Sequence, residues 1–123
     1  MLEPAYLQMI DLLIIEGNIS YADTLAVNFT KKFGQNPPIA LRLGKIRYEQ
    51  NQFDDAKKLF LRAATQSKKD QKAEALINAA DAAIKLNDYT EAKKRLKQAL
   101  RNAENEKLKI KCRRLLSTLD SKD

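Results

Sequence analysis

The sequence predicts an all-α fold in which antiparallel helical hairpins repeat along an α-solenoid. The 123 residues include only three glycines and three prolines, a composition that favours helices over a sheet with many turns. A short turn motif recurs three times, at intervals of 34 and then 36 residues. Apolar residues around each turn follow the i, i+3, i+4, i+7 spacing that is typical of amphipathic helices. These observations predict one repeat domain over residues 1–123.

The recurring motif predicts the turn inside each hairpin. Gly17, Asn51 and Asn87 begin its three copies, because Gly and Asn tolerate the left-handed backbone that ends a helix. A large apolar residue follows two positions later, and three positions further on an alanine suits the close crossing of the two helices. These residues are Ile19, Phe53 and Tyr89, then Ala22, Ala56 and Ala92. The residues expected to cap or begin the second helix are Ser20, Asp54 and Thr90.

Seven helices are expected, in chain order at 3–16, 19–33, 37–50, 53–67, 71–86, 89–103 and 106–119. The turn at Gly17 separates the first two. The third begins after Asn36, because the two prolines that follow it are tolerated in the first turn of a helix. Gly44 marks a close contact of this helix with a neighbour. The later helices follow from the apolar stripes that flank Asn51 and Asn87.

The second hairpin carries the most complete copy of the pattern, with Leu43, Gly44, Tyr48, Phe53, Ala56, Phe60 and Ala63. This spacing resembles that of the tetratricopeptide repeat family. The third hairpin resembles it through Ala79, Ala80, Tyr89, Ala92, Leu96 and Ala99. The first is degenerate, because Ile10 and Phe29 stand where the family has small residues. The resemblance implies a right-handed superhelix with repeats at 3–36, 37–70 and 73–106 and a capping helix at 107–119.

The composition argues against catalysis. The chain has no histidine and a single cysteine, Cys112, so histidine-based nucleophile pairs and multi-thiolate zinc sites are excluded. Its three glycines are too scattered to cradle a phosphate. We therefore expect no enzyme activity, no cofactor and no metal. Cys112 is expected on the inner face of the last helix, with a reactive thiol as the alternative.

The cysteine count and the length of the apolar segments give expectations for localisation and membrane contact. One cysteine fits a reducing compartment, so we expect a cytoplasmic protein. The apolar stretch 6–15 is interrupted by Asp11 and is far shorter than a membrane span. We therefore expect no direct insertion into a membrane.

The resemblance implies a ligand groove, because in this family the first helix of each hairpin lines the concave face. The candidate groove residues are Leu41, Arg42, Lys45, Tyr48, Asn78, Asp81 and Lys85, with Leu7, Gln8, Asp11, Ile15, Glu49 and Ile77 as further lining. Apolar anchors mixed with charges suit an extended peptide or a partner helix. We therefore expect a non-catalytic scaffold with a protein or peptide partner, although such charges can also serve solubility alone.

The carboxylate clamp of the family is absent. In the first repeat this clamp needs Lys and Asn, where Leu7 and Asp11 stand. In the third repeat, Glu74 and Asn78 replace its lysine and arginine. Acidic C-terminal tails of heat-shock chaperones are therefore not the expected ligands.

The basic C-terminal third supports a second hypothesis, nucleic-acid binding. The chain carries a net charge of +7, yet residues 1–30 contain four acidic residues and no Lys or Arg. The cations of the last two helices are Lys93, Lys94, Arg95, Lys97, Arg101, Lys107, Lys109, Lys111, Arg113 and Arg114. Because no aromatic residues interleave with them, a solvated basic face or an acidic protein partner is preferred over a nucleic acid.

The first helix is apolar on more than one side, which is unusual for the terminal helix of a solenoid. The interface candidates on it are Tyr6, Met9, Leu12, Leu13 and Ile15. Three explanations stay open: a second copy that forms a homodimer, a preceding helix of a larger parent protein, or a degenerate repeat whose helix lies deeper than the pattern suggests. The last helix is expected to be polar outside through Lys107, Lys109, Arg113, Arg114 and Lys122.

Overall fold

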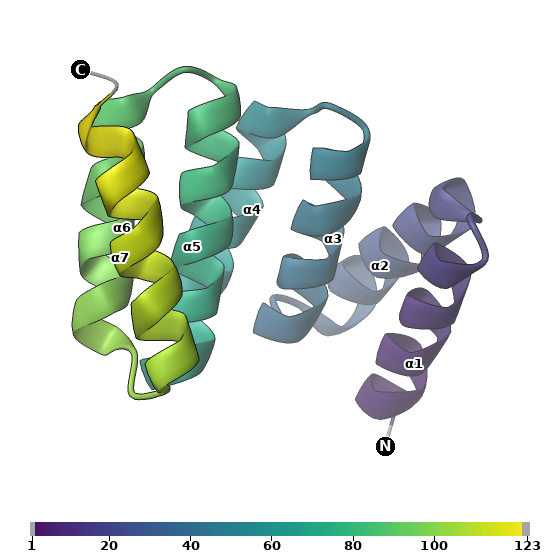
Figure 1. The fold of residues 1–123 in the computed structure, drawn as a ribbon. Helices are drawn as coiled ribbons and strands as arrows, with labels where there is room; N and C mark the ends of the chain where they lie inside the picture. Colours follow the sequence, from purple (N-terminus) through teal and green to yellow (C-terminus); the bar gives the residue numbers. More distant parts are fainter. Residues whose placement is uncertain (1, 122–123) are drawn as a thin grey trace.

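Residues 2–121 are described by a computed structural model, in which they form seven helices and no strand (Figure 1). The helices are α1 (Leu2–Ile15), α2 (Ile19–Phe33), α3 (Pro37–Glu49), α4 (Phe53–Thr65), α5 (Lys69–Lys85), α6 (Tyr89–Asn102) and α7 (Glu106–Asp120). Every boundary lies within two residues of its expected position. The all-α hairpin fold is therefore confirmed.

The turns inside the hairpins adopt the expected backbone conformation. Gly17, Asn51 and Asn87 have φ angles of +83°, +63° and +60°, in the left-handed region that Gly and Asn tolerate best. The N-cap residues are Asn18, Gln52 and Asp88, and of these Asp88 accepts a hydrogen bond from the backbone N–H of Glu91 at 3.1 Å. The residues expected to cap or begin the second helix are each in its first turn, so they begin it and do not cap it: Ser20, Asp54 and Thr90.

The helices form two layers (Figure 1). The first helices of the hairpins, α1, α3 and α5, lie with α7 in the front layer, and α2, α4 and α6 lie behind them. The two ends of the chain are at opposite ends of the array. Because α3 and α5 are separated along the array, the side of α4 between them faces the front layer. This arrangement creates the groove described below.

Alanines allow the close approach of the later helices. Helix α5 is enclosed on most sides, and six of its eight buried residues are alanine. Ala56 and Ala92, the alanines of the turn motif, are completely buried in α4 and α6. Small side chains at the crossing points let the helix backbones approach each other closely. The core of these hairpins is therefore densely packed although few of its side chains are large.

The first hairpin packs differently because it has large residues where the others have alanine. Phe29 is buried, and its ring lies 4.9 Å from the ring of Tyr6 and 4.8 Å from that of Phe33, measured between centroids. These rings fill the space between α1 and α2, which consequently approach each other less closely than α3 and α4 do. Phe29, at a degenerate position of the first repeat, therefore has a structural role: with Tyr6 and Phe33 it forms a separate aromatic core.

Candidate functional site

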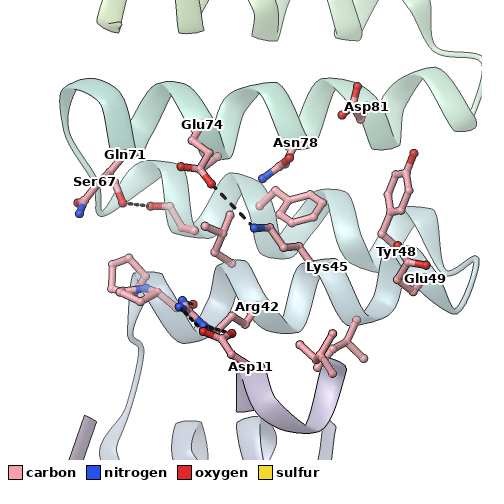
Figure 2. Close-up of a pocket in the computed structure, with 18 of the residues that line it drawn as sticks. Asp11, Arg42, Lys45, Tyr48, Glu49, Ser67, Gln71, Glu74, Asn78 and Asp81 are labelled. Carbon is pink, nitrogen blue, oxygen red and sulfur yellow. Dashed lines mark hydrogen bonds and ion pairs between the residues drawn. The ribbon is translucent and has the colours of Figure 1, made fainter. Parts of the chain in front are cut away.

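A groove runs between α3 and α5, with α4 as its floor and the end of α1 beside it (Figure 2). Its volume is about 1080 Å³. Figure 2 shows Arg42, Lys45 and Tyr48 on one side and Glu74, Asn78 and Asp81 on the other. The groove thus has two opposing walls, each formed by the first helix of a hairpin.

Most of the candidate groove residues line this groove, namely Leu41, Arg42, Lys45, Tyr48, Asn78 and Asp81. Lys85 is exposed and lies outside the lining. Ile77, also expected there, is only 2% exposed and belongs to the core. The reason is its position on α5, where it turns toward the neighbouring helices rather than toward α3. That the six lining residues contact a ligand stays a prediction.

The floor of the groove is apolar. It includes Phe60 and Ala63 of α4 and, from the walls, Leu41 and Ala75. Phe60 is able to reach the groove because Gly44 on α3 leaves room for its ring: a Cβ atom at residue 44 would lie 2.6 Å from Cε1 of Phe60. Phe60 was expected as part of the repeat pattern, and its position in the floor of the groove follows from its contact with Gly44.

Two ion pairs organise one part of the groove. Arg42 donates from Nε and Nη2 to the two carboxylate oxygens of Asp11, at 2.8 and 3.0 Å. This bidentate pair joins α1 to α3. Lys45 lies across the groove from Glu74, with 3.9 Å between the charged atoms and both side chains half exposed. The first pair is a structural link between hairpins, whereas the second is loose enough for either side chain to turn toward a ligand.

The opposite end of the groove is acidic and partly buried. Burial is the main reason why the pKa of Asp81 is raised, and nearby Lys111 and Lys85 reduce that rise. Burial also raises the pKa of Tyr48, followed by the negative charges of Asp81 and Glu49. Asp81 on the facing wall and Glu49 beside Tyr48 are therefore both close enough to act on the Tyr48 hydroxyl.

Asn78 has the one buried polar side-chain atom that lacks a hydrogen-bond partner among residues 2–121. This atom is its amide nitrogen Nδ2. Buried polar groups are nearly always hydrogen-bonded, so such an atom needs an explanation. Asn78 lines the groove, so its amide lies next to the space that a ligand would fill.

The interface candidates of α1 divide into three groups. Met9 and Leu12 are each 49% exposed. Tyr6 is partly buried against the rings of Phe29 and Phe33, and Leu13 is 7% exposed in the core of the first hairpin. Ile15 is 82% exposed and lines the groove. Leu13 is therefore unavailable to a partner, because it is buried in the core of the first hairpin, whereas Tyr6 keeps part of its surface exposed.

The basic face is smaller than the sequence indicates. Lys93 lies 4.0 Å from Asp120 with its side chain mostly buried, and Arg95 pairs with Glu91. On α6 the exposed cations are Lys94, Lys97 and Arg101. On α7, Lys107, Lys111, Arg113 and Arg114 are exposed, Lys109 is partly buried, and Lys122 lies outside the described residues.

Cys112 is completely buried, and burial raises the pKa of its thiol. A buried thiol of this kind packs as a small apolar side chain. Within residues 2–121, no three His, Cys, Asp or Glu side chains gather in a way that suits a metal ion. In the same part of the chain, no helix is long and apolar enough to cross a membrane.

Comparison with known proteins identifies the family to which this architecture belongs. The model of the tetratricopeptide repeat family matches residues 38–105, which is more than half of the chain. The chain belongs to the tetratricopeptide repeat family. The match covers the second and third hairpins, in agreement with the degenerate first repeat. No curated protein matches the chain.

Solved tetratricopeptide-like structures share its fold. One is the type III secretion chaperone SycD of Yersinia enterocolitica in complex with a peptide of the translocator YopD, with a TM-score of 0.86 and 16% identity over 97% of this chain and 92% of that one. SycD alone gives a TM-score of 0.83 and 16% identity over 97% and 83%. The N-terminal domain of stress-induced protein-1 from C. elegans gives 0.76 and 16% over 90% and 91%.

Proposed function

We propose that this tetratricopeptide repeat protein is a non-catalytic scaffold that binds an extended segment of a partner protein in the groove between α3 and α5. The observation that carries the proposal is the groove itself: an apolar floor at Phe60 and Leu41 between two polar walls. Protein-binding sites combine apolar anchors with a small number of polar groups in this way. We also expect the protein in the cytoplasm.

The length of the groove sets the length of the extended segment that can bind along it. Its α5 wall runs from Gln71 to Asp81, about 15 Å at the rise of an α-helix. About four or five residues of an extended strand fit along this wall.

Support also comes from the similar fold of SycD, which has been solved in complex with a peptide of YopD. At 16% identity the likeness concerns the fold, so it supports the type of ligand rather than its identity. The absence of the carboxylate clamp makes a different ligand chemistry necessary.

The proposal is tested by affinity purification with the full chain as bait, followed by mass spectrometry. Glu74→Trp obstructs the groove from an exposed position on its wall, and Lys97→Trp is the matched control on the exposed face of α6. We expect a set of proteins to be recovered with the wild type and with Lys97→Trp, and to be absent when Glu74→Trp is the bait. Equal recovery by both variants would place the binding surface outside the groove.

The same experiment addresses the nucleic-acid hypothesis. Lys94, Lys97 and Arg101 are spaced i, i+3 and i+7 and are exposed on one face of α6, which suits contacts to a phosphate backbone. Recovery that is lost after nuclease treatment, and after substitution of these three residues by Glu, would favour this function over the scaffold.

A further inference from the structure

The groove is acidic although the protein is basic. The whole chain has a net charge of +7. The groove lining, in contrast, contains two cations, Arg42 and Lys45, and four carboxylates, for a net charge of −2; the carboxylates are Asp11, Glu49, Glu74 and Asp81. The ligand surface therefore has the opposite sign to the protein as a whole.

Two of these carboxylates have no partner within the described part of the chain. Asp11 is bound by Arg42, and Glu74 faces Lys45. Within residues 2–121, no hydrogen bond or ion pair involves the side chain of Glu49 or of Asp81. They lie on opposite walls at the same end of the groove, and both act on the Tyr48 hydroxyl, whose pKa they help to raise. Two carboxylates without a direct hydrogen-bond or ion-pair partner thus lie near the Tyr48 hydroxyl.

The cations nearest to Asp81 do not neutralise it. Lys85 follows one turn later on α5, and Lys111 faces it from α7. Both are exposed, and neither comes within 4.0 Å of the carboxylate. Their combined effect is smaller than that of burial, because the pKa of Asp81 remains above its ordinary value. A closer cation, shielded from water by the groove, would stabilise the charged carboxylate more effectively.

We infer that the end of the groove formed by Tyr48, Glu49 and Asp81 binds a lysine or arginine side chain of the extended partner segment. This inference rests on the proposed function. The cation would lie between the two carboxylates, and the Tyr48 hydroxyl, on which both carboxylates act, would accept a hydrogen bond from it. Lys85 and Lys111 act on Asp81 and oppose such a ligand, but both are exposed to screening by salt and neither contacts the carboxylate.

Asn78 lies beside this site, on the same wall of the groove as Asp81. Its unpartnered Nδ2 is a hydrogen-bond donor one helical turn before Asp81, about 4.5 Å along the axis. A carbonyl of the ligand backbone satisfies this donor. Because adjacent residues of an extended chain are about 3.3 Å apart, that bond brings a neighbouring side chain of the ligand to Asp81.

The inference is tested with a phage-displayed library of random dodecapeptides, selected on the full wild-type chain. The most enriched sequence is synthesised with fluorescein, together with versions in which its basic residue is replaced by Ala or Glu. Binding is measured by fluorescence anisotropy against the wild type, Glu74→Trp, Asp81→Asn, Glu49→Gln and the control Asp55→Asn. Asp55 is exposed on α4, outside the groove.

We expect the enriched peptides to share a Lys or Arg at a fixed position. Asp81→Asn and Glu49→Gln should each lower the affinity for the parent peptide about tenfold, an effect typical of charge-assisted contacts. Asp81→Asn should also reduce the difference in affinity between the parent peptide and its Ala version. Asp55→Asn should change neither the affinity nor this difference. Asp81→Asn nearly preserves shape and removes a partly buried charge, so its fold should be retained.

Two results would overturn the inference in distinguishable ways. In the first result, the enriched peptides do not bind Glu74→Trp, carry no basic residue, and bind Asp81→Asn as tightly as the wild type. This result would support binding in the groove but refute the cation site. A selection that yields no binder, or binders that Glu74→Trp does not affect, would contradict the proposed function and the cation site together.

Discussion

The ring of Phe60 packs on the backbone of Gly44 so closely that a Cβ atom there would lie 2.6 Å from Cε1 and 2.7 Å from Cδ1. The contact holds α3 against α4 and places an aromatic floor in the groove. Phe60 is 2% exposed, so its ring has little room to yield to an added methyl group.

The first prediction concerns Gly44→Ala. Overpacking typically costs about 1–3 kcal/mol, and the higher helix propensity of alanine offsets up to about 1 kcal/mol of this. The free energy of unfolding in urea should therefore fall by roughly 1–2 kcal/mol. Lys45→Ala, at the neighbouring exposed position, is the control and should have little effect. A Gly44→Ala variant as stable as the wild type would show that α3 and α4 are not fixed by this contact.

The second prediction concerns the link between the first two hairpins. Arg42→Ala or Asp11→Ala removes the bidentate ion pair, whose side chains are 25% and 48% exposed. The pair should contribute roughly 0.5–1 kcal/mol, less at high salt. Amide hydrogen exchange in α1 and α2 should accelerate in both variants while α5 and α6 stay protected. Additive effects in the double variant would mean that the two residues do not interact in solution.

The structural role of Arg42 also affects the choice of groove variants. A variant that combines changes at Arg42, Lys45 and Tyr48 would weaken the α1–α3 link as well as the groove. Tyr48 additionally packs edge-to-face on Phe53, with 5.1 Å between ring centroids. Loss of binding in such a variant would have two explanations, which is why Glu74→Trp is the better test.

The third prediction is a pH dependence of stability through Asp70. Its carboxylate accepts hydrogen bonds from the backbone N–H groups of Asn105 and Glu104, at 3.0 and 2.7 Å, and these bonds hold its pKa below the ordinary value. The unfolded state then binds the proton more tightly, so the stabilisation is present above an unfolded pKa of about 3.9 and is lost as pH falls through the folded value.

Asp70→Asn tests this dependence, because the amide keeps an acceptor oxygen but has no charge. Urea denaturation at pH 7 should find the variant less stable than the wild type, and the difference should shrink as the pH falls below 4. Glu106→Gln, an exposed carboxylate in the same region, is the control. A difference between Asp70→Asn and wild type that is constant across this range would exclude the charge as its cause.

The fourth prediction concerns the apolar surface of α1. Met9 and Leu12 are half exposed there, and we propose that they contact a second copy of the chain or a neighbouring segment of a longer protein. The patch is far smaller than the 20–30 residues per side of a stable interface, so self-association should be weak. Analytical ultracentrifugation should show a mass that rises with concentration and that Leu12→Lys returns to the monomer.

Leu13→Lys separates this interface from simple folding defects. Leu13 is buried, so a charge there should unfold the first hairpin, whereas Leu12→Lys should keep the wild-type circular dichroism. A wild type that stays monomeric at every concentration would exclude the second copy and leave the neighbouring segment as the explanation.

The fold was predictable from the sequence because its signals are local. Gly17, Asn51 and Asn87 end helices through their own backbone preferences, and the apolar stripes follow the period of the helix. The pairing of Arg42 with Asp11 was not predictable, because the residues are 31 positions apart and the contact depends on how the first hairpin lies. A single sequence contains no signal for such a distance.

The groove was predictable only in part, because its shape depends on contacts between residues that are far apart in the sequence. The helical period and the family resemblance together indicate which face of α3 is inner, and Leu41, Arg42, Lys45 and Tyr48 line the groove. Lys85 does not, because the lining of α5 ends at Asp81, one turn earlier. The α1 residues Leu13 and Ile15 have similar hydrophobicity but opposite positions, one in the core and one at the groove. They lie two positions apart on α1, which places them on nearly opposite sides of the helix.

The central claim is that the groove between α3 and α5 binds the partner protein. The most direct test is isothermal titration calorimetry with a partner recovered by the wild-type chain, using Glu74→Trp and Lys97→Trp in parallel. We predict that Glu74→Trp abolishes measurable binding, because the indole fills the space above Phe60, while Lys97→Trp binds like the wild type. Wild-type affinity for the Glu74→Trp variant, with its fold intact by circular dichroism, would contradict the account.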